Sequence, residues 1–168
     1  VVRVWSEILK SIKNSKLILK SSIPLQTINI KNQFKKYGVL DSIIFSGSKP
    51  FKEHLNLYNS IDICLDTFPY NGVTTSFEAL WMGVPVLTIK GYNFNSRCGE
   101  SINKNLNLTS MIADDENDYI SKAKEFSDKE KLVNTRNIVF NNLLKSPLFD
   151  GKKFSKEFLG SLEAIYNK

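Results

Sequence analysis

Apolar and polar residues follow a pattern typical of α/β proteins along the first two thirds of the chain. Val1 to Lys13 carries apolar residues at helical spacing, and the apolar run Lys16 to Ser21 follows as a strand. Gln26 to Tyr37 again has helical spacing, with Gly38 as its stop, and Ser42 to Ser46 has the composition of a second strand. This alternation predicts parallel strands joined by helical crossovers.

The middle of the chain carries the clearest pattern. Ile61 to Leu65 suits a buried parallel strand, and Asp66 to Gly72 contains the Pro, Asn and Gly of a loop. A helix is expected to start at Thr74 or Thr75, because Thr is a good N-cap. The helix should end at Gly83, before a further strand, VPVLTI.

From Asn93 onward, the pattern of apolar residues predicts mostly helices. The expected elements are a helix over Asn93 to Leu106, a short strand over Met111 to Ala113, and helices over Asp114 to Phe126, Lys129 to Lys145 and Lys152 to Tyr166. Right-handed crossovers then predict a Rossmann-like parallel sheet of about five strands with helices on both faces. We expect one domain over residues 1–168, with an α/β core in 1–113 and C-terminal helices in 114–168. The last helix has an apolar stripe that would cover either this core or a partner domain.

Composition narrows the class of protein. The 168 residues are 42% hydrophobic, which is globular, and no apolar run approaches the ~20 residues of a membrane span. The net charge of +6 comes from lysines spread beside acids, so a solvated surface is favoured over nucleic-acid binding. Cys64 and Cys98 lie in predicted regular elements without metal-ligand spacing, which favours a reducing, cytoplasmic location.

The loop before the central helix has the chemistry of a phosphate site. Gly72 allows close approach of a ligand, Thr74 and Thr75 offer hydroxyls, and the first-turn amides of a helix are free donors. Glu78, one turn on, could accept hydrogen bonds from ribose hydroxyls. The same residues fit a plain helix start equally well, with Thr75 as a cap and Glu78 as a solvated acid.

Three stretches give the chain a family resemblance. They are LDTFPYNGVTTSFEALWMGVPVLTIKG (Leu65 to Gly91), SRCGESI (Ser96 to Ile102) and SPLFD (Ser146 to Asp150). In this order and spacing they resemble glycosyltransferase family 41, the O-linked N-acetylglucosamine transferases and their bacterial tetratricopeptide-repeat relatives. The resemblance covers essentially the whole chain and is weakest in Ile23 to Asp41.

The resemblance implies the C-terminal nucleotide-binding domain of a GT-B glycosyltransferase. Its expected function is to bind the UDP-sugar donor of an inverting, metal-independent transfer of N-acetylglucosamine from UDP-GlcNAc to protein Ser or Thr. No cofactor is expected. An upstream GT-B domain and any tetratricopeptide repeats would precede Val1, so the chain is expected to be a piece of a longer protein and inactive alone.

The resemblance also assigns site residues. No catalytic residue and no metal ligand are expected within the chain. UDP-sugar contacts are expected from His54, Asn71, Gly72, Val73, Thr74, Thr75 and Glu78, with Lys49, Ser96 and Arg97 as further candidates. The departures from the family are Val73 in place of a histidine, Glu78 in place of an aspartate, and Phe51 and Leu57 where animal members have basic residues.

The sequence is also compatible with two other functions. Val73 and the missing basic residues near His54 fit a degenerate nucleotide pocket that is structural or regulatory. A GT-B nucleotide-sugar epimerase would have the same fold. The identity of the sugar is also open, and a glucose donor remains compatible with the sequence.

Overall fold

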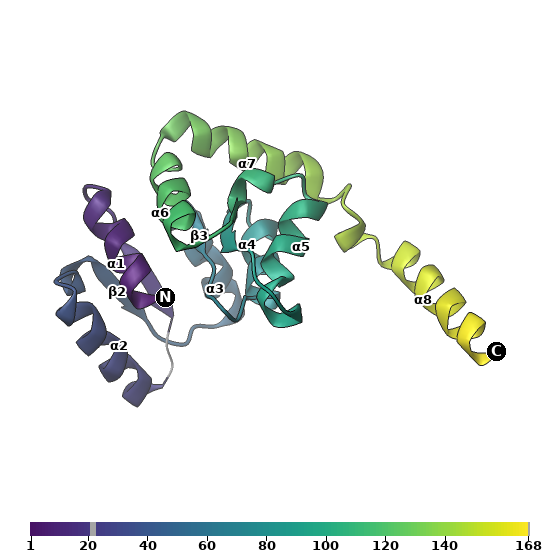
Figure 1. The fold of residues 1–168 in the computed structure, drawn as a ribbon, viewed down its shortest axis with the longest axis horizontal. Coiled ribbons are helices and arrows are strands. Elements are labelled where there is room, and N and C mark those ends of the chain that lie inside the picture. The colour runs from purple at the N-terminus through teal and green to yellow at the C-terminus, as the bar shows by residue number, and fades with distance from the viewer. Residues whose placement is uncertain (21–22, 168) are drawn as a thin grey trace.

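Strands and helices alternate in the computed structural model, which describes residues 1–20 and 23–167 (Figure 1). The described strands are β1 (Leu17–Lys20), β2 (Ile43–Ser46), β3 (Cys64–Leu65), β4 (Val86–Ile89) and β5 (Ile112–Ala113). The α-helices are α1 (Val2–Ser11), α2 (Pro24–Lys36), α3 (Phe51–Leu57), α4 (Thr74–Trp81), α5 (Cys98–Asn105), α6 (Glu116–Glu125), α7 (Lys129–Leu143) and α8 (Gly151–Tyr166). Ser21, predicted as the end of the first strand, and Lys168 lie outside the described residues.

All pairings between the described strands are parallel, which confirms the α/β class. The five strands do not form the single continuous sheet that the sequence predicted. They form two separate ladders, β1-β2 and β3-β4-β5. The discontinuity lies between β1 and β3, which line the same cavity without pairing with each other.

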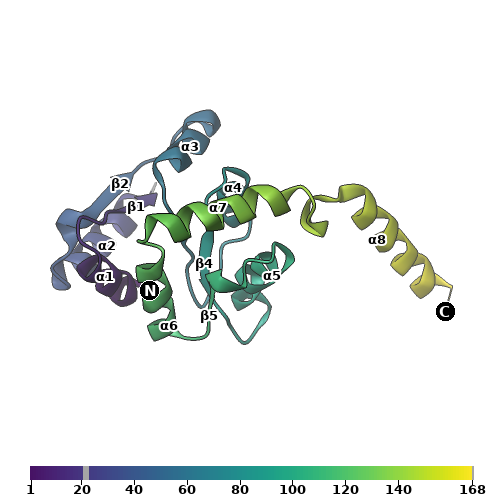
Figure 2. The same ribbon diagram turned by 90° about the horizontal axis from the view of Figure 1, so that it is seen from above.

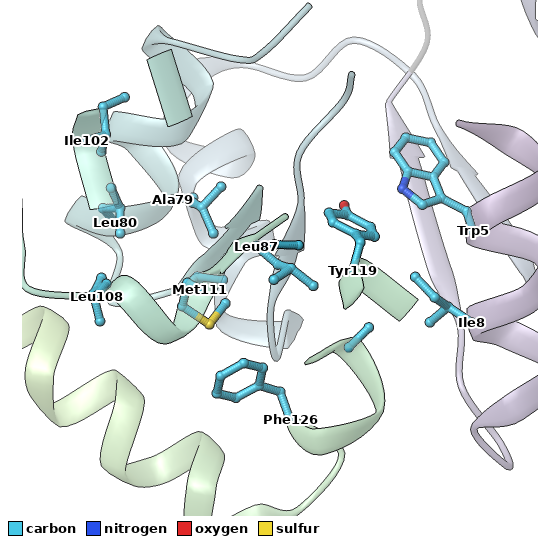
Figure 3. Packing of buried hydrophobic residues seen from close by; sticks show 14 of the residues in the cluster. Trp5, Ile8, Ala79, Leu80, Leu87, Ile102, Leu108, Met111, Tyr119 and Phe126 are labelled. Atoms are coloured by element: carbon cyan, nitrogen blue, oxygen red, sulfur yellow. The ribbon is translucent and has the colours of Figure 1, made fainter. Parts of the chain in front are cut away.

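The core is built around β4, which among the described strands is the one paired on both edges. Leu87 of β4 is fully buried, and Met111, Tyr119 and Phe126 surround it (Figure 3). Helices α5 and α6 both pack against β4, and Figure 2 shows them on opposite sides of it. This central layer holds the carboxyl ends of β3 and β4 in place, where ligands bind in open α/β sheets.

Two glycines end helices as the sequence predicted. Gly38 follows α2 with φ +69°, and Gly83 follows α4 with φ +72°, both in the left-handed region that favours glycine. The helix predicted over residues 93–106 is instead divided. A 3-10 turn, η3 (Phe94–Ser96), precedes α5, because the side chains of Asn93 and Ser96 cap each other's backbone and close the turn.

Helix α8 stands clear of the body of the molecule (Figures 1 and 2). It follows a 3-10 turn, η5 (Pro147–Phe149), and its apolar residues are exposed, with the Phe154 and Phe158 rings stacked 5.7 Å apart. Its apolar stripe therefore does not cover the core of this domain. Within residues 1–20 and 23–167, every helix is too short or too polar to cross a membrane.

A substitution at Gly99 of α5 tests how closely α5 packs on β4. A Cβ added at Gly99 would lie 2.3 Å from Thr88 Oγ1 and 2.7 Å from Asp66 Oδ2, both buried, so Gly99→Ala should lower the free energy of unfolding by about 1–3 kcal/mol. Gly160→Ala is the matched control, because Gly160 is also helical and a Cβ there meets open space. Urea unfolding should show no loss for Gly160→Ala. Equal stability of the two variants would contradict the close packing.

Candidate functional site

The start of α4 presents unpaired donors to solvent. The first backbone bond of the helix runs from Phe77 N to Val73 O at 3.0 Å, so the amides of residues 74–76 have no acceptor within the helix. Thr74 and Thr75 occupy the first two helical positions and are exposed. The prediction that one of these threonines is the N-cap is wrong, since Val73 occupies that position. The helix itself begins at Thr74, as predicted, and both hydroxyls are available to a ligand.

Asp66 holds the loop before α4 in place. Its Oδ1 accepts a hydrogen bond from Gly72 N at 2.8 Å, and its Oδ2 accepts one from Thr88 Oγ1 of β4 at 2.8 Å. Its carbonyl accepts a bond from Tyr119 Oη at 3.0 Å. Asp66 was not among the site residues predicted from the sequence. The available signal was an acid between a buried strand and a glycine loop, where a side chain can fold back onto the backbone.

Burial raises the pKa of the Asp66 carboxyl to about 6. Loss of solvation is the largest cause, and the hydrogen bonds from Gly72 and Thr88 oppose it. Asp66 is 7% exposed, so the carboxylate relies on these donors for its solvation. The loop therefore depends on a group that gains a proton in mildly acidic solution.

Gly72 and Asn71 complete the loop in different ways. A Cβ on Gly72 would lie 2.6 Å from Thr75 Oγ1, so a larger residue there would displace the Thr75 hydroxyl. Asn71 is buried, donates from Nδ2 to Thr67 O at 2.9 Å and accepts from Gly99 N at 3.2 Å. Both ends of the Asn71 amide are thus engaged with the backbone, and the side chain fastens the loop to α5.

His54 and Glu78 form a pair between α3 and α4. His54 Nε2 lies 3.0 Å from Glu78 Oε2, and both side chains are mostly buried. The Tyr58 ring meets the imidazole edge to face, 5.5 Å between centroids. Nδ1 of His54 is buried and has no hydrogen-bond partner among the described residues. Both residues were predicted as UDP-sugar contacts, but their contact with each other was not, because 24 residues separate them.

Ser96 and Arg97 lie beside the loop that precedes α4, since Asn71 N of that loop donates to Asn95 O at 3.0 Å. The Ser96 hydroxyl is buried and accepts from the Tyr92 and Asn93 amides at 3.0 Å, so it is committed to the turn. Arg97 is half-exposed and contacts Glu100 through Nε at 2.9 Å. Lys104 and Arg97 together hold the pKa of the Glu100 carboxyl below its usual range.

The remaining candidates are peripheral. Lys49 is exposed in the segment between β2 and α3, and Val73 is 46% exposed at the start of α4. Phe51 is exposed and Leu57 is half-buried on α3. The part of the chain that the structure describes holds no cluster of three or more His, Cys, Asp or Glu residues able to bind a metal ion. That the site works without a metal stays a prediction.

A cavity of about 1100 Å³ opens at the site. His54, Gly72 and Thr75 all line it, so the imidazole and the loop of α4 face one volume. The start of α4 thus combines free backbone amides and the hydroxyls of Thr74 and Thr75 with the carboxylate of Glu78, one helical turn further on. Such a set can bind an anionic group at the helix start and a polyhydroxylated group beside it.

Comparisons with known proteins place the chain among its relatives. Residues 1–158 match the sequence model of the family described as Glycosyl transferase family 41. The chain is 33% identical to the probable UDP-N-acetylglucosamine–peptide N-acetylglucosaminyltransferase SPINDLY of Solanum lycopersicum, over 99% of this chain and 18% of that protein. It is 32% identical to the UDP-N-acetylglucosamine–peptide N-acetylglucosaminyltransferase of Caenorhabditis elegans, over 98% of this chain and 14% of that protein.

A solved structure is also similar. It is a mutant O-GlcNAc transferase of Thermobaculum terrenum, with a TM-score of 0.85 and 29% sequence identity, and the match covers 98% of this chain and 32% of that one. The chain therefore spans less than a third of the length of each of these three proteins.

The raised pKa of Asp66 predicts a pH-dependent stability. A carboxyl whose pKa is higher when folded stabilises the fold below its unfolded value of 3.8, and this contribution is lost as pH rises through about 6. Between pH 4.5 and 7, the free energy of unfolding should lose about 2 kcal/mol from this group. In Asp66→Asn, which keeps an acceptor for Gly72 and a group able to bond Thr88, that loss should disappear.

Urea unfolding at the two pH values measures the difference. Glu100→Gln is the control, because it removes a buried carboxylate outside the loop. Since the pKa of Glu100 is lowered in the fold, its loss should leave the fall in stability between pH 4.5 and 7 in place and slightly steeper. Identical pH dependence in wild type and Asp66→Asn would exclude Asp66 as its source.

Proposed function

The chain belongs to glycosyltransferase family 41, and we propose that it binds the nucleotide-sugar donor of a protein glycosyltransferase. The observation that carries the proposal is the exposed start of α4. Free first-turn amides and the hydroxyls of Thr74 and Thr75 converge at the carboxyl end of β3. The proposed ligand is UDP-GlcNAc, which the similar proteins' names specify for those proteins.

In this proposal the pyrophosphate binds at the start of α4. The positive end of the helix dipole and the two hydroxyls would balance its negative charge. The loop is held in advance by Asp66, so the donors need little rearrangement when the ligand arrives. Because these donors can stabilise the departing UDP without a cation, we propose a metal-independent reaction.

The ribose is proposed to lie against Glu78. Its carboxylate can accept from the ribose hydroxyls, while His54 Nε2 holds it from the other side. The Nδ1 of His54 is buried without a partner among the described residues, and it is proposed to lie beside the base of the nucleotide. Gly72 allows the backbone to come close to the ligand, whereas Asn71 and Ser96 act by fixing the loops around it.

The rest of the reaction is proposed to need other residues. None of the described residues is assigned as a catalytic base, and the acceptor is proposed to be a protein Ser or Thr attacking with inversion at the anomeric carbon. A second GT-B domain, with or without tetratricopeptide repeats, would supply the acceptor groove. The chain by itself is proposed to bind the donor without transferring the sugar, in the cytoplasm.

Stabilisation by UDP tests the proposed site. At UDP concentrations about 100 times the dissociation constant, the free energy of unfolding should rise by roughly 2.7 kcal/mol. Thr75→Ala and Glu78→Ala should each weaken binding by about 1–3 kcal/mol, since each loses a hydrogen bond to a charged or strongly polar group. Thermal unfolding with increasing UDP measures the effect.

Two exposed residues away from the loop provide controls. Thr109→Ala and Glu130→Ala remove the same side chains from other helix starts and should leave the UDP effect unchanged. If UDP at millimolar concentration stabilises neither the chain nor the full-length protein, the pocket is degenerate.

Glu78 can be tested against the ribose directly. Wild type should bind UDP more tightly than 2′,3′-dideoxy-UDP by about 1.5–3 kcal/mol, because a carboxylate accepts the hydroxyls strongly. In Glu78→Ala the two nucleotides should bind almost equally, as measured by calorimetry on the full-length protein. A preference of unchanged size in Glu78→Ala would place the ribose elsewhere.

A further inference from the structure

Asp66 is a buried carboxyl whose charge is not balanced by a cation. Its hydrogen-bond donors, Gly72 N and Thr88 Oγ1, are both neutral groups. No ion pair within residues 1–20 and 23–167 includes Asp66. A buried charge without an opposite charge beside it readily becomes neutral, so the proton occupancy of this carboxyl is sensitive to any further charge nearby.

The carboxyl lies directly behind the proposed phosphate site. A Cβ on Gly72 would lie 2.6 Å from Thr75 Oγ1 and 3.4 Å from Asp66 Oδ1, so both oxygens border the same methyl-sized volume. The Thr75 hydroxyl and the free amides of residues 74–76 are the donors proposed to hold a pyrophosphate. An anion bound there would face a like charge that solvent screens little, and like charges disfavour the ionised form of a carboxyl.

The Asp66 carboxyl can take up a proton without releasing the loop. Its Oδ1 accepts from Gly72 N, and the carbonyl oxygen of a neutral carboxyl accepts in the same way. The proton would then lie on Oδ2, which contacts Thr88 Oγ1, a hydroxyl that can accept as well as donate. Protonation therefore removes the charge behind the site and leaves both contacts of the loop in place.

The groups packed around the carboxyl do not compete with it for this proton. Cys64 on β3 and Tyr119 on α6 interact with Asp66 electrostatically, and burial raises the pKa of the thiol and of the phenol, so both stay neutral in mildly acidic solution. Thr88 on β4 and Gly99 on α5 face the carboxyl without charge. Burial raises the pKa of Asp66 itself to about 6, which places its titration near neutral pH.

The other titratable groups near the site have partners of their own. His54 on α3 lies 3.0 Å from Glu78 Oε2 of α4. Glu100 follows Gly99 on α5, but its carboxylate contacts Arg97 and Lys104. His54 is therefore the group whose titration an experiment must separate from that of Asp66.

We propose that Asp66 takes up a proton from solvent when the diphosphate of a nucleotide sugar binds at the start of α4, so that the donor binds most tightly when this carboxyl is neutral. The proton relieves the repulsion between the two anionic groups, and no bond of the nucleotide changes. This inference rests on the proposed function, because it requires a diphosphate beside Thr75.

Calorimetry of UDP-GlcNAc binding to the full-length protein, without divalent cations, tests the proposal. The diphosphate of UDP-GlcNAc is esterified at both ends and does not itself titrate between pH 5 and 8. Titrations in buffers of different ionisation enthalpy count the protons taken up. If binding raises the pKa of Asp66 by about one unit, the uptake should reach about half a proton near pH 6.5, and the affinity should fall roughly eightfold from pH 5 to 8.

Asp66→Asn separates the charge of this residue from a structural role. The amide is always neutral, so the variant should lose the uptake and bind UDP-GlcNAc roughly eight times more tightly than wild type at pH 8, where His54 is in the same state in both proteins. A purely structural role would instead weaken binding at every pH. Asp62→Asn is the matched control, because Asp62 is exposed before the other end of β3, and this variant should keep the uptake.

Thr88→Val provides a second test that does not depend on the folding of Asp66→Asn. It removes a hydrogen bond that lowers the pKa of Asp66, so the uptake should move to higher pH. Binding without uptake in wild type, uptake of equal size in Asp66→Asn, or an unchanged pH range in Thr88→Val would overturn this proposal alone. Absence of UDP-GlcNAc binding at every pH would overturn the proposed function as well.

Discussion

The structure around the candidate site depends on one buried carboxylate. Asp66 follows β3 and joins three elements, because its side chain bonds Gly72 of the loop and Thr88 of β4, and its carbonyl accepts from Tyr119 of α6. Burying a carboxylate is costly unless donors replace its water. In this protein the cost appears as the raised pKa of Asp66. The hydrogen bonds from Gly72 and Thr88 reduce this cost, and the same bonds hold the loop in place.

This anchoring explains how a short loop can present a helix start in a fixed position. The loop cannot move away from β4 without losing the hydrogen bond from Gly72 N to Asp66, and the buried side-chain amide of Asn71 ties the loop to α5. The first turn of α4 is therefore directed at solvent with its donors in place. A site for an anion needs such fixed donors more than it needs flexible side chains, since they cost little reorganisation on binding.

The α/β domain leaves two apolar surfaces uncovered. One lines the cavity between β1 and β3, and the other is the stripe of α8, which includes Phe154, Phe158 and Leu159. Both lie at the edges of the α/β core, and neither disturbs β4 or the helices packed on it. The core is thus complete around the candidate site although these two surfaces are exposed.

The sequence by itself determined the local features. Helical and strand periodicity predicted α1, β1, β2, α4 and the later helices, and Gly38 and Gly83 marked helix ends correctly. These signals are local, because side-chain spacing and left-handed glycine conformations depend on neighbours in sequence. Tertiary structure alone decided the rest. The pairing of His54 with Glu78, the bond between Asp66 and Thr88, and the split between β1 and β3 each join or separate residues more than 20 positions apart. Packing between elements sets such contacts, and the spacing of residues along the chain does not encode them.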